Sequence, residues 1–167
     1  MESVWVLAVL VNNHFGVLTR VTGLFSRRGY NIVSLSVGET HQPEISRITI
    51  QTRADGAGVH QIARQLEKLE DIHAVEILPG AEIIARELIL AKLEAPPAQH
   101  GALLEALSGL PCRRPYHDET VIVLELTGCP EECRLFLEIV ARYTIRELCR
   151  TGVTAMAATR HVEMPAL

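Results

Sequence analysis

The residues best suited to bind a small ligand lie in the segment Asn12-Asn13-His14-Phe15-Gly16, which links an apolar run to a helical pattern. Free backbone N–H groups at a helix N-terminus bind anions such as a carboxylate. Gly16 permits a close approach to the backbone, and the Asn13 amide can both donate and accept hydrogen bonds. The segment could therefore hold an amino-acid zwitterion. The same residues are typical of an ordinary helix start, with Asn as the cap, and the local pattern alone favours that simpler interpretation.

A second polar segment, Gly29-Tyr30-Asn31, follows the expected helix. Gly29 is typical of a helix end, with Arg27 and Arg28 in the last turn where the helix dipole favours cations. Asn31 then opens a strand that could face the first loop of another copy of the chain. Spacing does not decide between a plain helix stop and a binding role.

The elements that position these segments follow from the apolar periodicity of the first eighty residues. Residues 3–11 are nearly all apolar, which predicts a strand buried on both faces. Helical stripes follow in residues 17–25 and 59–69, and strand patterns in 33–37, 48–50 and 72–78. The order β-α-β-β-α-β predicts a ferredoxin-like unit with both helices on one face of an antiparallel sheet. The other face, carrying Ser34, Ser36, Arg47 and Thr49, is expected to be left to solvent or a partner.

The second half of the chain repeats this order. Residues 87–93, 112–116, 120–126 and 145–149 are strand candidates, although Pro111 and Pro115 interrupt the second of them. Helices are expected over residues 99–107 and from Pro130, a favoured first helical residue. The fold class is therefore α+β with two tandem ferredoxin-like βαββαβ units, residues 1–80 and 81–167. The tail from Thr159 is expected to be loosely ordered.

No arrangement of residues indicates catalysis or a metal site. Cys129 and Cys133 have three residues between them and no second pair, whereas zinc sites show two such pairs or a Cys pair with a His pair. Cys133 and Cys149 fall at expected core positions. The seven His are scattered, and neither a nucleophile motif nor a Gly-rich phosphate loop occurs. We expect no catalytic residue and no metal ligand.

Composition excludes further classes of function. The formal net charge of −4 disfavours nucleic-acid binding, which needs concentrated positive charge. The apolar run 4–11 is too short to span a bilayer and lacks the flanks of a signal peptide. We therefore expect a cytoplasmic protein that does not bind membranes, with its four Cys reduced.

The stretch NNHFGVLTRVTGLFSRRGYNIVSLSVGETHQPEISRITIQT closely resembles the N-terminal segment of the small regulatory subunits of acetolactate synthase. The runs QIARQLEKLEDIHAVEIL, RELILAKL and IRELCRTGV resemble later segments of that family, in the same order. Two positions depart from the pattern. Phe15 stands where many members have a small residue, and residues 110–119 differ from the usual second-domain segment.

The resemblance implies an ACT domain, an amino-acid-binding βαββαβ unit, followed by a second ferredoxin-like domain. It implies a homodimer that binds valine between the loop of one subunit and the second strand of its neighbour. Asn13, Gly16 and Asn31 match the family positions, and the effector site as a whole comprises Asn13, His14, Phe15, Gly16, Val17, Leu18, Asn31 and Ile32. The expected partner is the large catalytic subunit, which holds thiamine diphosphate, magnesium and often FAD, and no cofactor is expected in this chain.

The implied function is to activate that subunit and to confer feedback inhibition by valine in branched-chain amino acid biosynthesis. A stand-alone ACT-type sensor for another enzyme or regulator is the main alternative. A ferredoxin-like RNA binder is disfavoured by the acidic charge balance and by strand faces without paired aromatic residues. An independent enzyme is least favoured, because no catalytic set is present.

Overall fold

The computed structural model describes residues 2–78 and 83–158. The chain divides into two compact units, described separately below. The first contains the residues up to Ile84 together with the segment that begins at Val153, and the second is Ala85–Gly152. These bounds differ from a division at residue 80, because the chain returns to the first unit after the last strand of the second.

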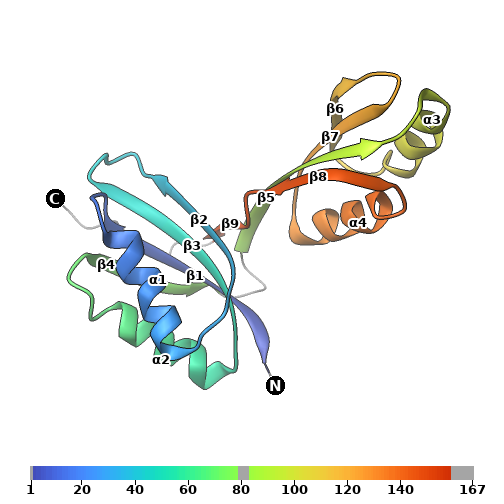
Figure 1. Cartoon of the computed structure of the whole chain (residues 1–167). Coiled ribbons are helices and arrows are strands. Elements are labelled where there is room, and N and C mark those ends of the chain that lie inside the picture. The colour runs from blue at the N-terminus through green and yellow to red at the C-terminus, as the bar shows by residue number, and fades with distance from the viewer. Residues whose placement is uncertain (1, 79–82, 159–167) are drawn as a thin grey trace. The chain divides into compact units, whose positions relative to one another are not determined.

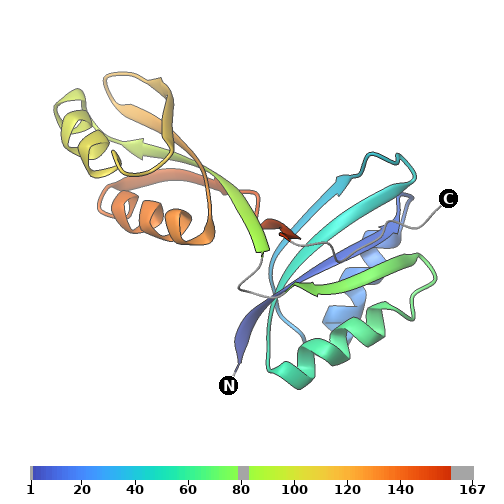
Figure 2. The ribbon, with the colours of Figure 1, turned by 180° about the vertical axis from the view of Figure 1, so that it is seen from behind.

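The first unit is a four-stranded antiparallel sheet with two helices on one face (Figures 1 and 2). The spatial order of its strands is β2-β3-β1-β4, as a ferredoxin-like unit requires. Its elements are β1 (Ser3–Asn12), α1 (Val17–Arg28), β2 (Ile32–Glu39), β3 (Ile45–Ala54), α2 (Gly56–Leu66) and β4 (Ile72–Leu78).

The core of the first unit confirms the expected patterns. In β1, the five residues from Leu7 to Val11 are buried, so the prediction of a strand covered on both faces is confirmed. The α1 stripe packs onto the sheet through Val17, Val21, Leu24 and Phe25. Leu18 is apolar and falls within the helical pattern of residues 17–25, but it lies on the exposed side of the helix.

The end of α1 is a glycine-terminated cap. Gly29 has φ 71°, and its N–H donates to Ser26 O at 3.2 Å. Tyr30 N donates to Phe25 O at 3.0 Å, and the two rings pack edge to face. These bonds satisfy carbonyls that the helix leaves unpaired. They also turn the chain into β2, so that Asn31 stands at the entrance of this strand.

The outer face of the first sheet is covered in part by the chain itself, which corrects the expectation of a face left to solvent or a partner. After Gly152 (φ 76°), residues 153–157 fold onto this face and include β9 (Thr154–Ala157). Val153 and Ala155 are buried, as is Thr49 of the sheet. Periodicity did not indicate β9, because four residues are too few to show a pattern. Residues 159–167, expected to be loosely ordered, lie outside the described residues.

The second unit repeats the topology of the first, with the antiparallel order β6-β7-β5-β8 and α3 and α4 packed on one face. Pro115 is accommodated in β6, where the register with β7 shifts between Arg113 and Tyr116. Cys133 is buried as expected, but Cys149 is exposed, because β8 is an edge strand. The elements are β5 (Ile83–Glu94), α3 (Pro97–Ala106), β6 (Cys112–His117), β7 (Val121–Gly128), α4 (Pro130–Val140) and β8 (Thr144–Arg150).

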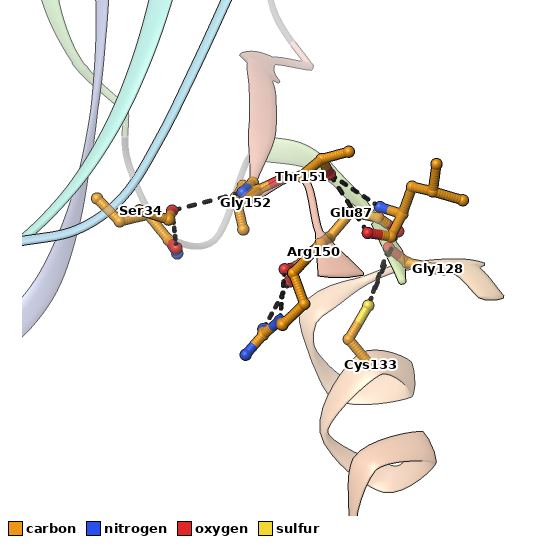
Figure 3. Close-up of polar contacts among 10 residues, drawn as sticks. Ser34, Glu87, Gly128, Cys133, Arg150, Thr151 and Gly152 are labelled. Carbon is orange, nitrogen blue, oxygen red and sulfur yellow. Dashed lines mark hydrogen bonds and ion pairs between the residues drawn. The ribbon is translucent and has the colours of Figure 1, made fainter. Parts of the chain in front are cut away.

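A buried ion pair closes the end of β8 (Figure 3). Arg150 donates from Nε and Nη2 to the two carboxylate oxygens of Glu87, at 2.7 and 2.9 Å. The Glu87 side chain is 4% exposed, and the guanidinium offsets the cost of removing its carboxylate from water. These hydrogen bonds raise the pKa of Arg150. The neighbouring Leu88 N donates to Thr151 Oγ1 at 3.1 Å. Both contacts fix the chain just before it leaves the unit.

Candidate functional site

The loop before α1 presents a helix N-terminus with no side-chain cap. Gly16 is the N-cap residue, with φ 89° and ψ −14°, and its carbonyl accepts from Arg20 N at 3.1 Å. An Asn cap was the simpler interpretation of the sequence, but Gly16 has no side chain to accept from the first-turn N–H groups. These N–H groups and the helix dipole can therefore bind a carboxylate.

Asn13 is fixed by the turn that joins β2 to β3. Its Nδ2 donates to Glu39 Oε1 at 3.0 Å and to Pro43 O at 2.8 Å, and its backbone N–H donates to Glu44 O at 2.7 Å. Both amide hydrogens are thus used within the unit. Only Oδ1 remains for a ligand, and an amide oxygen suits an ammonium group.

His14 and Phe15 complete the loop. His14 Nε2 lies 2.9 Å from the carboxylate of Asp71, and Nδ1 lies 3.1 Å from Phe15 O. The Phe15 side chain is 99% exposed among the residues that the structure describes. An aromatic ring so exposed is available to a ligand or a second molecule.

The apolar candidates have different environments. Val17 is buried in the core of the unit, so its side chain is occupied by packing. Leu18 is 42% exposed, one residue further into the first turn of α1. Ile32 is half-buried at the start of β2. Leu18 and Ile32 are therefore the side chains that could contact an aliphatic ligand.

Asn31 lies at the opposite end of α1 from this loop. Its carbonyl accepts from Thr52 Oγ1 at 2.8 Å, and its side chain is exposed. The 12 residues of α1 separate it from Gly16 by about 18 Å along the helix axis. The candidate residues thus form two groups within one chain, the loop 13–18 and the pair Asn31 and Ile32, and these groups do not meet.

Sequence reasoning missed the contacts that hold the loop in place. Asp71, a buried residue just before β4, binds Asn12, His14 and Arg20. Glu39, Pro43 and Glu44 hold Asn13 from the other side. The sequence offered one signal, because Arg20 is four residues from Gly16 and so lies on the same helix face as the loop.

Among residues 2–78 and 83–158, no cluster of three or more His, Cys, Asp or Glu could hold a metal ion. None of the described helices is both long and apolar enough to cross a membrane.

Comparison with known proteins identifies the family. A model described as the AHAS small subunit-like ACT domain matches residues 7–74, and a model of the small subunit of acetolactate synthase matches residues 86–159. A probable acetolactate synthase small subunit of Archaeoglobus fulgidus is 40% identical over 151 residues, covering 90% of this chain and 94% of that protein. The chain belongs to the acetolactate synthase small-subunit family.

Further members of the small-subunit family agree over nearly the whole chain. The acetolactate synthase small subunit of Mycolicibacterium smegmatis is 37% identical over 153 residues, covering 90% of this chain and 89% of that protein. The crystal structure of the small subunit from Thermotoga maritima matches with a TM-score of 0.86 and 26% identity. It covers 95% of this chain and 99% of that one. The first unit is thus the ACT domain of an acetolactate synthase small subunit, and the family implies a catalytic large-subunit partner.

Proposed function

We propose that this chain forms a homodimer that binds valine and confers feedback inhibition on the thiamine-diphosphate-dependent large subunit of acetolactate synthase, which it also activates. The observation that carries the proposal is the position of Asn13 beside the end of β2. Asn13 Nδ2 donates to Glu39, the last residue of that strand, at 3.0 Å. The loop therefore lies at one end of β2, and Asn31 lies at the other.

The edge of the sheet supports an assembly that would bring these two ends together. Among the described strands, β2 is at the edge of its sheet and pairs only with β3, and Val33 and Val37 are 42% and 44% exposed. Such an edge can pair with another strand. Antiparallel pairing of two copies about the middle of β2 places Ile32 of one copy opposite Glu39 of the other. Asn31 of the second copy then lies beside Asn13 and Gly16 of the first.

The chemistry of the joined groups suits an aliphatic amino acid. The ligand carboxylate accepts from backbone N–H groups at the start of α1. Asn13 Oδ1 accepts from the ammonium group, and Leu18 with Ile32 of the second copy contacts the aliphatic side chain. Because one ligand contacts both copies, its binding depends on the geometry of the dimer. Valine inhibits if it binds more tightly to a less active arrangement of the holoenzyme than to the active one, because binding then shifts the population toward the less active form.

Reconstitution tests this function. The chain is purified with an acetolactate synthase large subunit, and acetolactate formation is measured with and without the chain and with increasing L-valine. We expect the chain to raise the activity and valine to lower it. Binding of valine without association with the large subunit would instead support a stand-alone sensor. Association without any response to valine, leucine or isoleucine would exclude the effector site.

A further inference from the structure

Asp71 is a buried carboxylate placed beside the loop that precedes α1. It lies in the turn between α2 and β4, and its side chain is 8% exposed. Removing a carboxylate from water costs free energy, which charged or hydrogen-bonding partners offset. Among the described residues, the side chains that contact the Asp71 carboxylate come from one stretch of chain, residues 12–20.

The partners of Asp71 flank the loop on both sides. Asn12 ends β1, and its side-chain Nδ2 donates to Asp71 Oδ1 at 3.5 Å. His14 lies within the loop, with Nε2 2.9 Å from Asp71 Oδ1. Arg20 is on the second turn of α1 and forms an ion pair with Asp71 Oδ2. One carboxylate group thus ties the strand end, the loop and the helix start together.

The charges of this cluster also bear on anion binding. A lone carboxylate near a helix N-terminus would repel a second one, since both are negative. The guanidinium of Arg20 offsets the charge of Asp71 and is itself about half exposed. Asp71 thereby orders the loop and holds a cation next to it without opposing a bound carboxylate.

We propose that Asp71 is the positioning residue of the effector loop. Through His14 and Arg20 it holds the backbone N–H groups at the start of α1 in the arrangement that binds the ligand carboxylate. It does not touch the ligand. This role rests on the proposed function, because the ligand is the amino acid assigned there. At metal sites, removing a group that orients a ligating residue weakens affinity by about tenfold or more, and we expect an effect of similar size at this loop.

The test compares Asp71→Asn and Arg20→Gln with the wild-type chain. Arg20→Gln changes a half-exposed side chain, so the comparison stands if Asp71→Asn fails to fold. The matched control is Glu87→Gln, which removes a buried carboxylate paired with an arginine in the second unit rather than in the ACT domain. The dissociation constant for L-valine is measured by calorimetry, and amide hydrogen exchange of residues 13–18 is measured without amino acid.

We expect both loop variants to bind L-valine about tenfold more weakly and to exchange these amides faster. The double variant should lose little more affinity than either single one, because the two side chains act as a pair. Glu87→Gln should lose stability but keep its affinity and its loop exchange. Unchanged affinity in folded Asp71→Asn or Arg20→Gln, or an equal loss in Glu87→Gln, would overturn the role.

Amide hydrogen exchange of the loop, measured without amino acid, tests the positioning role of Asp71 independently of valine binding. If the wild-type chain binds no L-valine, the effector assignment fails, and the ligand part of the inference fails with it. Faster loop exchange in Asp71→Asn would still support the ordering of the loop by Asp71. Unchanged amide exchange of the loop in Asp71→Asn would overturn the ordering role of Asp71 as well.

Discussion

Arg47 Nη2 donates to the main-chain carbonyl of Ala155 at 3.0 Å, across 108 positions of sequence. A second bond, from Val153 N to Ser34 Oγ at 3.4 Å, ends on the labelled Ser34 of Figure 3. The two bonds hold residues 153–157 on the outer face of the ACT sheet. Burial lowers the pKa of Arg47, while the nearby charge of Glu76 opposes the shift. Arg47 Nε is also buried, with no acceptor among the described residues. The hydrogen bond to Ala155 therefore stabilises the segment, but the buried Nε without an acceptor reduces the net gain in free energy.

Replacing Arg47 should loosen this C-terminal segment. We expect Arg47→Ala to lower the free energy of unfolding by about 1 kcal/mol, the scale of a single hydrogen bond. Amide exchange should accelerate in residues 154–157, because the bond to Ala155 is lost. Arg53→Ala, an exposed residue of the same strand, is the control and should change neither quantity. Unaltered exchange of the segment in Arg47→Ala would show that the apolar contacts of Val153 and Ala155 hold it alone.

Breaking the Glu87–Arg150 ion pair of the second unit should lower the free energy of unfolding by more than the loss of the Arg47 hydrogen bond does. Arg150→Ala leaves the Glu87 carboxylate buried without its partner, and we expect a loss of about 2 kcal/mol in urea unfolding. Arg150 is 46% exposed, so the loss should be smaller than for a fully buried pair. Arg134→Ala removes an exposed i,i+4 pair with Glu138 and should cost below about 0.5 kcal/mol. Equal losses for the two variants would contradict the structural difference between the pairs.

The start of α4 predicts a dependence of stability on pH. Glu132 Oε2 accepts from Cys129 N at 2.7 Å, and this hydrogen bond lowers the pKa of Glu132. Because the folded-state pKa lies below the unfolded one, its stabilisation is complete above the ordinary Glu value. It is lost as pH falls through the folded-state pKa. The stability difference between wild type and Glu132→Gln should therefore shrink in acid, as followed by thermal unfolding across pH. Glu131→Gln, at the adjacent position, is the control and should show a smaller change.

Two glycines, one at the N-cap of α1 and one inside the helix, should respond in opposite ways. Gly16 has φ 89°, so Gly16→Ala should cost about 1–2 kcal/mol although nothing crowds the added methyl group. Gly23 is inside the helix, and an alanine there meets only Arg27 Nη1 at 3.6 Å. Gly23→Ala should gain about 0.5–1 kcal/mol. Chemical denaturation measures both, and a stabilised Gly16→Ala would contradict the left-handed conformation of this residue.

Mixing two defective variants tests whether the effector site is shared between copies. We expect Asn31→Ala and Gly16→Ala each to weaken the response to valine, because each removes one half of both sites. In a mixed dimer, one site carries both changes and the other carries neither. Co-expression of the two variants should therefore restore part of the valine inhibition in the reconstituted enzyme. Mixed dimers that respond no better than their parents would contradict a shared site, and co-expressed wild-type and Asn31→Ala chains provide the positive control.

The sequence by itself determined the elements and their order, because these depend on local patterns. Alternation and helical stripes located all the strands and helices of both units except β9, and Gly29 marked the end of α1. The motifs of the first ninety residues also identified the family that the comparisons confirm. A repeated apolar pattern is enough to locate a helix or strand, because an amphipathic element must bury its apolar face whichever element packs against it.

Only the tertiary structure decided which polar side chains are buried and with what. Asp71 looks like any acidic turn residue until β4 is placed beside β1, when it contacts Asn12, His14 and Arg20. Cys149 follows a core pattern but lies on an exposed edge strand, and Arg47 is covered by residues more than a hundred positions away. Such contacts join distant parts of the chain, and the free energy of a buried charge depends on those partners rather than on neighbours in sequence.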